Sequence, residues 1–412
     1  MARQAIKKGT GIQKRGLSAW KEKNGMAIEK PKEGEVIKET ELGTSNANKP
    51  MEWILMPKAF QDVTKLPGIA QGYVTEIMGH SNVGKSTFLN HAIVSAQKQG
   101  LIPVIFDTEN SFSFQYAMTM GFQVEPIYGN VEIEDIDEET GEVTTHIENK
   151  IINYEGNFLY FNHKILADRW GDFDYTAGKR VSKRRKTAVL EDIAMSINEL
   201  LDAQENGEIE QGFLFVIDSI GTIGCWKEIS SGEAKLSNPM WVAAALSQAF
   251  SNIVNNRIPA SKKMSSKYTN TFLYVNKVWM DSMTNPMGAS IMRPKGGASL
   301  HYSARTQYIL GGVNVAGVKF LKATSKGLDY TYGIQTKIKV QKNHLDAPYN
   351  VCYEGPLVAT DCGFIGVDEL DSYKKTHVAK ILKELNERAA GKFEIKESDI
   401  AFEEVEETEI EN

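Results

Sequence analysis

Cysteine is scarce in this chain, and long apolar runs are missing. Its 412 residues include three cysteines, Cys225, Cys352 and Cys362, too few and too scattered for a disulfide framework or a zinc site. No run of about 18 apolar residues occurs, so we expect no membrane-spanning helix. Residues 1–4 lack the apolar core of a signal peptide. These absences indicate a protein of a reducing, intracellular compartment.

An even distribution of charge is also missing. The net charge of −6 would argue against nucleic acid as a partner if it were uniform, but the two signs are segregated. Residues 1–50 form a basic N-terminal arm, either a polymerisation element or a disordered solubilising segment. Residues 394–412 carry nine acidic residues against one lysine. We expect this tail to be mobile and to act as an electrostatic decoy for the chain's own basic surface or only as a solubility aid.

A phosphate-binding loop is the strongest motif. It comprises Gly79, His80, Ser81, Asn82, Val83, Gly84, Lys85, Ser86 and Thr87. The two glycines let the backbone wrap closely around phosphates, Lys85 would reach the β- and γ-phosphates, and Ser86 would coordinate Mg²⁺. A buried strand is predicted over 73–78 and a helix over 88–99, the order that such a loop requires. The alternative is a glycine-rich turn that binds no ligand.

Two apolar strands end in carboxylates. The strand predicted over 102–109 ends at Glu109, and the strand over 212–219 reaches Asp218 near its end. Carboxyl ends of parallel strands share the sheet edge of the phosphate loop, so Glu109 would orient an attacking water. Asp218 would hold Mg²⁺ through water or Ser86. Glu109 could instead be an ordinary helix N-terminal carboxylate.

Residues 124–186 interrupt the alternation of strands and helices. The first part alternates as an acidic hairpin, and an aromatic-rich stretch then ends in six basic residues within 179–186. Aromatic and basic side chains together suit nucleic-acid contact, but they equally suit a small core with a solvated rim. The segment is therefore predicted as a β-rich insertion with a basic end.

A third core strand, over 271–276, leads into a long polar loop. Lys277 follows Asn276, and either side chain could sense a γ-phosphate and transmit its presence into the loop at 279–297. A loop of this length favours function over a simple strand-to-helix connection. Further strands are expected around 308–310 and over 334–340.

The order of these motifs resembles the RecA family of homologous recombinases, and within it the phage UvsX-like branch. The resemblance covers 66–123 and 187–357, and it begins with the phosphate loop and the strand that ends at Glu109. The segment 116–121 is similar to the one whose tyrosine stacks on adenine, which gives Tyr116 that role. Ser113 stands where bacterial members of the family have an aspartate.

The resemblance also implies two DNA-binding loops. Residues 238–248 are similar to the end of the first loop and its following helix, which makes Met240 and Trp241 candidates for contact with bases. The residues assigned to the second loop are Arg293, Lys295, Gly296 and Gly297. Asn276 and Lys277 occupy the family's Asn-Gln switch position, with lysine in place of glutamine.

The segment 339–348 resembles the one that reaches the nucleotide of a neighbouring subunit. It supplies Lys342, while His344 stands in place of a second lysine. A cation supplied across the subunit boundary would neutralise transition-state charge only in an assembly. His344 would add charge only if its pKa were raised.

We expect an α/β fold with a RecA-like P-loop ATPase core, whose twisted, mainly parallel sheet is flanked by helices. The core would comprise 51–123 and 187–357, followed by a small C-terminal region over 358–393 with a helix at 373–388. The resemblance implies an ATP- and Mg²⁺-dependent recombinase that exchanges DNA strands in homologous recombination and repair. A ring-forming helicase or motor, and an ATP-switched DNA-binding scaffold without strand exchange, remain alternatives.

The resemblance also implies the partners and the compartment. Single-stranded and double-stranded DNA, further copies in a helical filament, a single-strand binding protein and a loader would be partners, and no membrane would be involved. The setting would be the cytoplasm or nucleoid of a phage-infected bacterial cell.

Overall fold

The computed structural model describes residues 47–136, 143–230, 239–281, 291–294, 298–311, 318–325, 327–388 and 400–406. The chain divides into two units, 1–46 and 47–412, and the described residues all belong to the second. Most of the predicted basic arm and the turn of the acidic hairpin therefore lie outside the described residues. In the described part, no helix is both long and apolar enough to cross a membrane.

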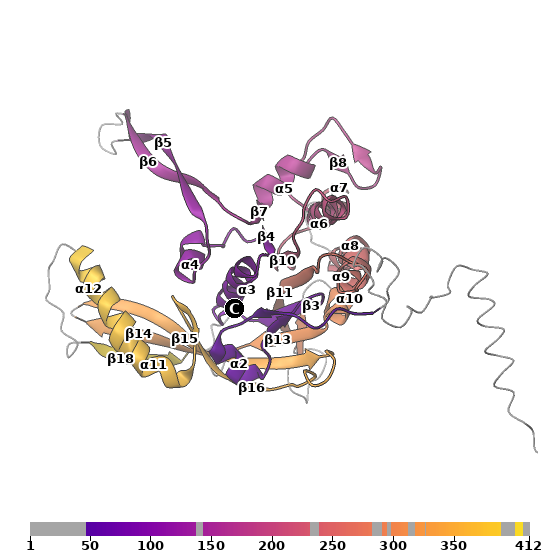
Figure 1. The fold of residues 1–412 in the computed structure, drawn as a ribbon. Coiled ribbons are helices and arrows are strands. Elements are labelled where there is room, and N and C mark those ends of the chain that lie inside the picture. The colour runs from indigo at the N-terminus through magenta and orange to yellow at the C-terminus, as the bar shows by residue number, and fades with distance from the viewer. Residues whose placement is uncertain are drawn as a thin grey trace, which may run out of the picture. The chain divides into compact units, whose positions relative to one another are not determined.

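A mixed β-sheet forms the centre of this unit (Figure 1). Its central strands in spatial order are β17 (Gly363–Ile365), β16 (Glu354–Thr360), β15 (Leu328–Asn343), β13 (Thr306–Leu310), β3 (Val74–Gly79), β11 (Thr271–Asp281), β10 (Phe213–Asp218), β4 (Ile102–Asp107) and β7 (Leu159–Asn162). Neighbours from β13 to β7 run parallel, and β15 to β17 pair in antiparallel fashion. The predicted α/β fold with a mainly parallel sheet is confirmed.

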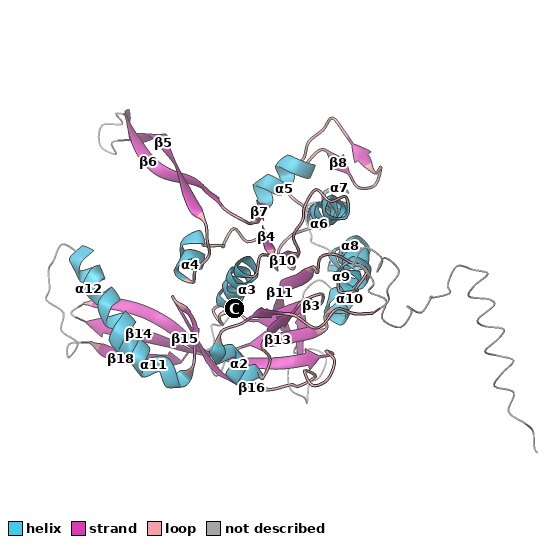
Figure 2. Cartoon of the chain, in the orientation of Figure 1, coloured by secondary structure: helices cyan, strands magenta, loops and turns pink. Residues whose placement is uncertain are grey.

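Helices cover both faces of the sheet (Figure 2). On β10, Leu214 and Val216 face one apolar cluster, while Phe213, Phe215 and Ile217 face the other, as the period of two in a strand requires. The helices of the first face are α2 (Lys58–Thr64), α3 (Lys85–Lys98) and α4 (Phe114–Thr119). Those of the second face are α6 (Leu190–Glu205), α8 (Pro239–Asn252), α9 (Ile258–Ser261) and α10 (Ala298–Ser303). Because both faces are buried, the core strands are almost continuously apolar.

Shorter elements complete the unit. The helical ones are α5 (His163–Trp170), α7 (Trp226–Ser230), η2 (Ile253–Arg257), η3 (Val367–Glu369), α11 (Leu370–Tyr373), η4 (Lys374–Val378) and α12 (Ala379–Arg388). The remaining strands are β1 (Trp53–Leu55), β2 (Gly68–Ala70), β5 (Glu125–Ile136), β6 (Val143–Glu155), β8 (Phe173–Asp174), β9 (Lys179–Arg180), β12 (Ile291–Pro294), β14 (Lys319–Ser325) and β18 (Ala401–Glu406). The predicted C-terminal helix over 373–388 is present and begins slightly earlier, at Leu370.

The segment predicted as an insertion, 124–186, has two structural parts. Strands β5 and β6 form the predicted acidic hairpin as a two-stranded sheet of their own. Strand β7, by contrast, pairs in parallel with β4 and extends the central sheet. Part of the segment therefore belongs to the core, which the sequence analysis missed because β7 is only four residues long.

The aromatic side chains of this segment pack against one another. Tyr154 stacks on Phe114 of α4 with ring centroids 4.3 Å apart, and Trp170, Phe173 and Tyr175 form a second cluster. Within the basic run, Arg185 donates to the buried Asp192 carboxylate with Nη1 2.7 Å from Oδ2. These contacts support the small-core interpretation for the aromatic residues and for Arg185.

Two expectations about loops and ends were wrong. Residues 279–297 were expected to form a loop, but β11 continues to Asp281 and pairs with β12, because backbone groups beyond the core still find antiparallel partners there. The tail was expected to be mobile, but its residues 401–406 form β18 on β14. The Phe402 ring lies 5.9 Å from that of Tyr332, so an apolar contact accompanies the pairing. Residues 394–399 and 407–412 lie outside the described part.

Candidate nucleotide-binding site

The phosphate loop connects β3 to α3, as predicted. Helix α3 begins at Lys85, and Gly84 before it has a φ of 91°, a left-handed conformation that favours glycine. A Cβ on Gly79 would lie 2.6 Å from the carbonyl oxygen of Leu310, so only glycine fits there. The N-terminus of α3 thus faces the carboxyl edge of the sheet, where its free N–H groups can bind anions.

A cavity of about 360 Å³ opens at this edge. Its lining residues are Ser81, Asn82, Val83, Gly84, Lys85, Ser86, Thr87, Glu109, Ser111, Asp218, Lys277 and Ile334. The structure therefore brings together most of the phosphate loop with three side chains predicted from other strands. These are Glu109, Asp218 and Lys277, which follow or end β4, β10 and β11.

Lys85 folds back onto the loop that carries it. Its Nζ donates to the carbonyl oxygen of Gly79 at 3.0 Å and to that of His80. Burial lowers the pKa of Lys85 to about 8, although the charges of Asp218 and Glu109 oppose this shift. The ammonium group is thus held at the cavity by neutral carbonyls, which a phosphate oxygen can replace.

Asp218 lies at the end of β10 and lines the same cavity as Ser86. Burial, followed by the nearby charges of Glu109 and Asp107, raises the pKa of Asp218 to about 6. In the part of the chain that the structure describes, no hydrogen bond reaches its carboxylate, so its oxygens remain available to a ligand.

The chemistry of this donor set fits Mg²⁺. A hydroxyl and a carboxylate are hard oxygen ligands, and Mg²⁺ usually binds one or two such groups together with water and phosphate oxygens. Within the described ranges, no group of three or more His, Cys, Asp or Glu side chains could hold a metal by itself. Ser86 and Asp218 would therefore hold Mg²⁺ only in company with a nucleotide.

Glu109 is held from two sides. The Ser219 hydroxyl donates to its Oε1 at 2.5 Å, and the Lys277 ammonium lies 3.1 Å from its Oε2. The predicted water-positioning residue and the predicted switch residue therefore form an ion pair. Both residues were expected at this edge, but their direct contact was not.

Asp107 organises the turn that carries Glu109, and the sequence analysis did not single it out. Its carboxylate, 1% exposed, accepts the N–H groups of Ser111 and Phe112 at 3.0 Å and that of Glu109 at 3.3 Å. The Tyr160 hydroxyl donates to the same group at 2.9 Å. Only its position at a strand end before a polar turn could have indicated this role.

Tyr116 lies in α4 next to the phosphate loop. Its hydroxyl is 2.9 Å from Thr87 Oγ1 and donates to the carbonyl oxygen of Thr360 at 2.7 Å. Burial raises the pKa of Tyr116 to about 12, so the hydroxyl remains a donor at neutral pH. Its role in stacking on adenine stays a prediction.

Lys342 and His344 lie outside the set of described residues that line the cavity. Lys342, near the end of β15, donates to the carbonyl oxygen of Tyr302 at 3.0 Å, and His344 is exposed. Their predicted reach to a neighbouring subunit's nucleotide is compatible with these positions and stays a prediction.

The predicted DNA-binding residues are only partly described. Met240 is 77% exposed at the start of α8, and the Lys227 ammonium lies 4.9 Å from the centroid of the Trp241 ring. The backbone of Arg293 belongs to β12, while Lys295, Gly296 and Gly297 lie outside the described residues.

A buried carboxylate links the site to the element after the second predicted loop. Glu76 in β3 is fully buried and accepts from Asn276 Nδ2 at 3.0 Å and Gln307 Nε2 at 2.9 Å. Its Oε2 also lies 2.7 Å from His301 Nδ1 in α10. The sequence signal for this network was a single acidic residue within the apolar strand over 73–78.

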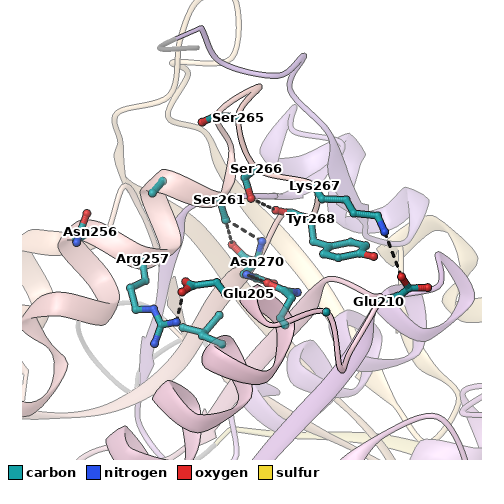
Figure 3. Close-up of a pocket in the computed structure, with 14 residues that line it drawn as sticks. Glu205, Glu210, Asn256, Arg257, Ser261, Ser265, Ser266, Lys267, Tyr268 and Asn270 are labelled. Atoms are coloured by element: carbon teal, nitrogen blue, oxygen red, sulfur yellow. Dashed lines mark hydrogen bonds and ion pairs between the residues drawn. The ribbon is translucent and has the colours of Figure 1, made fainter. Parts of the chain in front are cut away.

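A larger cavity, about 520 Å³, lies near residues that precede β10 and β11, at the opposite edge of the parallel strands (Figure 3). Its polar side chains bond to one another: Asn270 to Gln204, Arg257 to Glu205, and Lys267 to Glu210. The Ser261 hydroxyl accepts the backbone N–H of Asn270. The smaller cavity is the better ligand site. It combines an anion-binding helix end with the Asp218 carboxylate, which accepts no hydrogen bond from the described residues.

Comparison with known proteins agrees with this geometry over part of the chain. Residues 39–156 match the family described as RecA N-terminal domain. Protein RecA of Aquifex aeolicus is 39% identical over 70 residues, which are 17% of this chain and 20% of that protein. Protein RecA of Mesoplasma florum is 40% identical over 68 residues, 15% of this chain and 20% of that protein.

The chain thus spans about a fifth of the length of these relatives. The family match ends directly after the hairpin β5–β6, and it includes the phosphate loop, Glu109 and Tyr116. In this region the chain is similar to RecA proteins, and its fold is that of a RecA-like P-loop core.

Proposed function

We propose that this protein is an ATP-dependent DNA strand-exchange recombinase that forms filaments on single-stranded DNA in homologous recombination and repair. The observation that carries this proposal is the cavity in which the phosphate loop, Glu109, Asp218 and Lys277 converge. The partial match to RecA proteins supports it. The resemblance of the motif order to the phage UvsX-like branch leads us to propose that branch.

Nucleotide binding begins at the phosphate loop. The loop N–H groups and Lys85 hold the phosphates of ATP, and the ammonium exchanges the carbonyls of Gly79 and His80 for phosphate oxygens. Ser86 and Asp218 hold Mg²⁺, which neutralises phosphate charge when bound. Tyr116 stacks on the adenine.

Hydrolysis depends on Glu109, which orients the attacking water. Its ion pair with Lys277 competes with that task, and a γ-phosphate would draw the lysine away because it carries more negative charge than one carboxylate. Lys342 and His344 of a neighbouring subunit complete the site. Turnover then depends on assembly, because the stabilising cation comes from another copy.

Single-stranded and double-stranded DNA would lie along Met240, Trp241, Arg293 and Lys295 to Gly297. Binding would be independent of sequence and strongly dependent on salt, because phosphates supply most of the affinity. A single-strand binding protein and a loader would assist, in the cytoplasm or nucleoid of a phage-infected bacterial cell. The core would comprise 51–123 and 187–357 together with β7.

The test combines ATP hydrolysis with electron microscopy. We expect hydrolysis to rise when single-stranded DNA is added and open helical filaments to form with an ATP analogue. Lys85→Ala should abolish both, since it removes the phosphate-binding cation, whereas Glu109→Gln should bind ATP and DNA but lower turnover to a small residual rate. Closed hexamers with unwinding activity would favour a ring motor, and DNA binding without stimulated hydrolysis would favour an ATP-switched scaffold.

A further inference from the structure

Strand β7 and the helix after it contact the turn that carries Glu109. The Tyr160 hydroxyl in β7 donates to Asp107 Oδ2 at 2.9 Å. His163, the first residue of α5, has its Nε2 2.8 Å from the carbonyl oxygen of Thr108. Two side chains from one edge of the sheet therefore meet the residues directly before Glu109.

The Asp107 carboxylate transmits the effect of the Tyr160 contact, whereas His163 acts on the backbone of the next residue, Thr108. Each of the two carboxylate oxygens accepts two hydrogen bonds. Of these four, three come from backbone N–H groups of the turn 109–112 and one comes from the Tyr160 hydroxyl. The turn includes Asn110 in a left-handed conformation, with a φ of 52°. Such a conformation persists when its surroundings fix it, so the Asp107 contacts determine where the turn directs Glu109.

We propose that Tyr160 and His163 are positioning residues for hydrolysis. They fix the turn from Asp107 to Phe112, so that Glu109 stays within reach of both Ser219 and the cavity. This inference rests on the proposed ATPase function and adds to it the requirement for an intact contact from β7.

Removing only the Tyr160 hydroxyl distinguishes its positioning role from the packing of its ring. Its ring lies 5.4 Å from that of Phe114 and 6.1 Å from that of Phe112, contacts that phenylalanine would keep. Burial and the Asp107 charge raise the pKa of Tyr160, so the hydroxyl is protonated and donates throughout the neutral range. Tyr160→Phe therefore removes one hydrogen bond and leaves the ring in place.

The experiment compares Tyr160→Phe with Tyr128→Phe under steady-state ATP hydrolysis. Tyr128 lies on the hairpin, is 58% exposed, and supplies the same chemical change away from the turn. We expect kcat to fall about three- to tenfold in Tyr160→Phe with KM for ATP unchanged, and no change in Tyr128→Phe. His163→Ala should lower kcat in the same way.

A second measurement distinguishes positioning from loss of folding. The double variant Tyr160→Phe, Glu109→Gln should hydrolyse ATP no more slowly than Glu109→Gln alone. The reason is that Tyr160 acts only by positioning the Glu109 carboxylate, which Glu109→Gln already removes. An unchanged kcat in Tyr160→Phe, or a full further loss in the double variant, would overturn the inference while the wild-type protein hydrolyses ATP. Absence of hydrolysis in the wild-type protein would instead reject the proposed function, and this inference with it.

Discussion

Asp107 and Asp218 are the same residue type in equivalent places, yet their surroundings differ. They pair directly across the parallel strands β4 and β10, and each ends its strand at the carboxyl edge of the sheet. Asp107 accepts four hydrogen bonds from its own chain. The Asp218 carboxylate accepts none within the described residues, and burial raises its pKa to about 6.

At one edge of the sheet, two aspartates in equivalent positions thus have different roles, one structural and one open to chemistry. A carboxylate whose oxygens are all hydrogen-bonded stabilises a turn, because its charge is already compensated. A carboxylate that is buried beside other acids without donors is costly until a cation arrives. Asp107 therefore supports the turn, whereas the surroundings of Asp218 suit the metal-binding role that we propose for it.

The largest effect is expected from Asp218→Asn. ATP turnover with Mg²⁺ should fall by about 100-fold or more, because the proposed ligand of the metal is lost. The free energy of unfolding without nucleotide should instead rise by about 1 to 2 kcal/mol at pH 7, because the disfavoured carboxylate charge is removed.

That gain has a defined pH window. The folded-state pKa is raised from 3.8 to about 6, so the wild-type protein recovers stability by protonating Asp218 as pH falls through this range. The advantage of Asp218→Asn should therefore vanish near pH 4. Urea unfolding across pH 4 to 7 measures it, and a destabilised variant at pH 7 would contradict the comparison.

An effect of opposite sign on the free energy of unfolding is expected from Asp107→Asn. The amide cannot accept hydrogen bonds at both ends, so backbone N–H groups of the turn lose their partner in a buried place. The free energy of unfolding should fall by about 2 to 4 kcal/mol. Asp168→Asn in α5, an exposed position, is the matched control; equal stability of the two variants would remove the distinction between support and ligand.

The smallest effect concerns pH and nucleotide affinity. Lys85 must be protonated to bind phosphate, and its pKa of about 8 means that ATP affinity should fall above pH 8, by up to about tenfold per pH unit. Because the charge of Asp218 raises the pKa of Lys85, Asp218→Asn should shift the fall to lower pH. Calorimetric titration with a non-hydrolysable ATP analogue tests this; an identical profile in the variant would exclude the coupling.

The sequence predicted the parts of the site that share a motif or a strand end. The phosphate loop, Glu109, Asp218 and Lys277 were expected at one edge, and one cavity contains them all. Strand propensity and motif spacing were enough to predict this, because parallel strands align their carboxyl ends at one edge of the sheet.

The remaining features depend on partners distant in sequence. Asp107 and Asp218 look alike as residues before a turn, and only the three-dimensional neighbours distinguish them. Strands β7, β12 and β18 are short or polar, and their pairing with β4, β11 and β14 provides the hydrogen bonds that their own sequences do not indicate. The role of Glu76 as a buried hydrogen-bond acceptor likewise becomes evident only from the elements packed around it.

The composition of the hairpin β5–β6 also affects how readily copies of the protein aggregate. Large apolar side chains are exposed along it, namely those of Ile127, Tyr128, Val143, Ile147, Ile151 and Ile152. An exposed strand with such residues is a template for aggregation, but acidic residues such as Glu132 and Glu134 interrupt the apolar positions and repel a second hairpin. The negative charge of the hairpin thus keeps copies of the protein dispersed in solution.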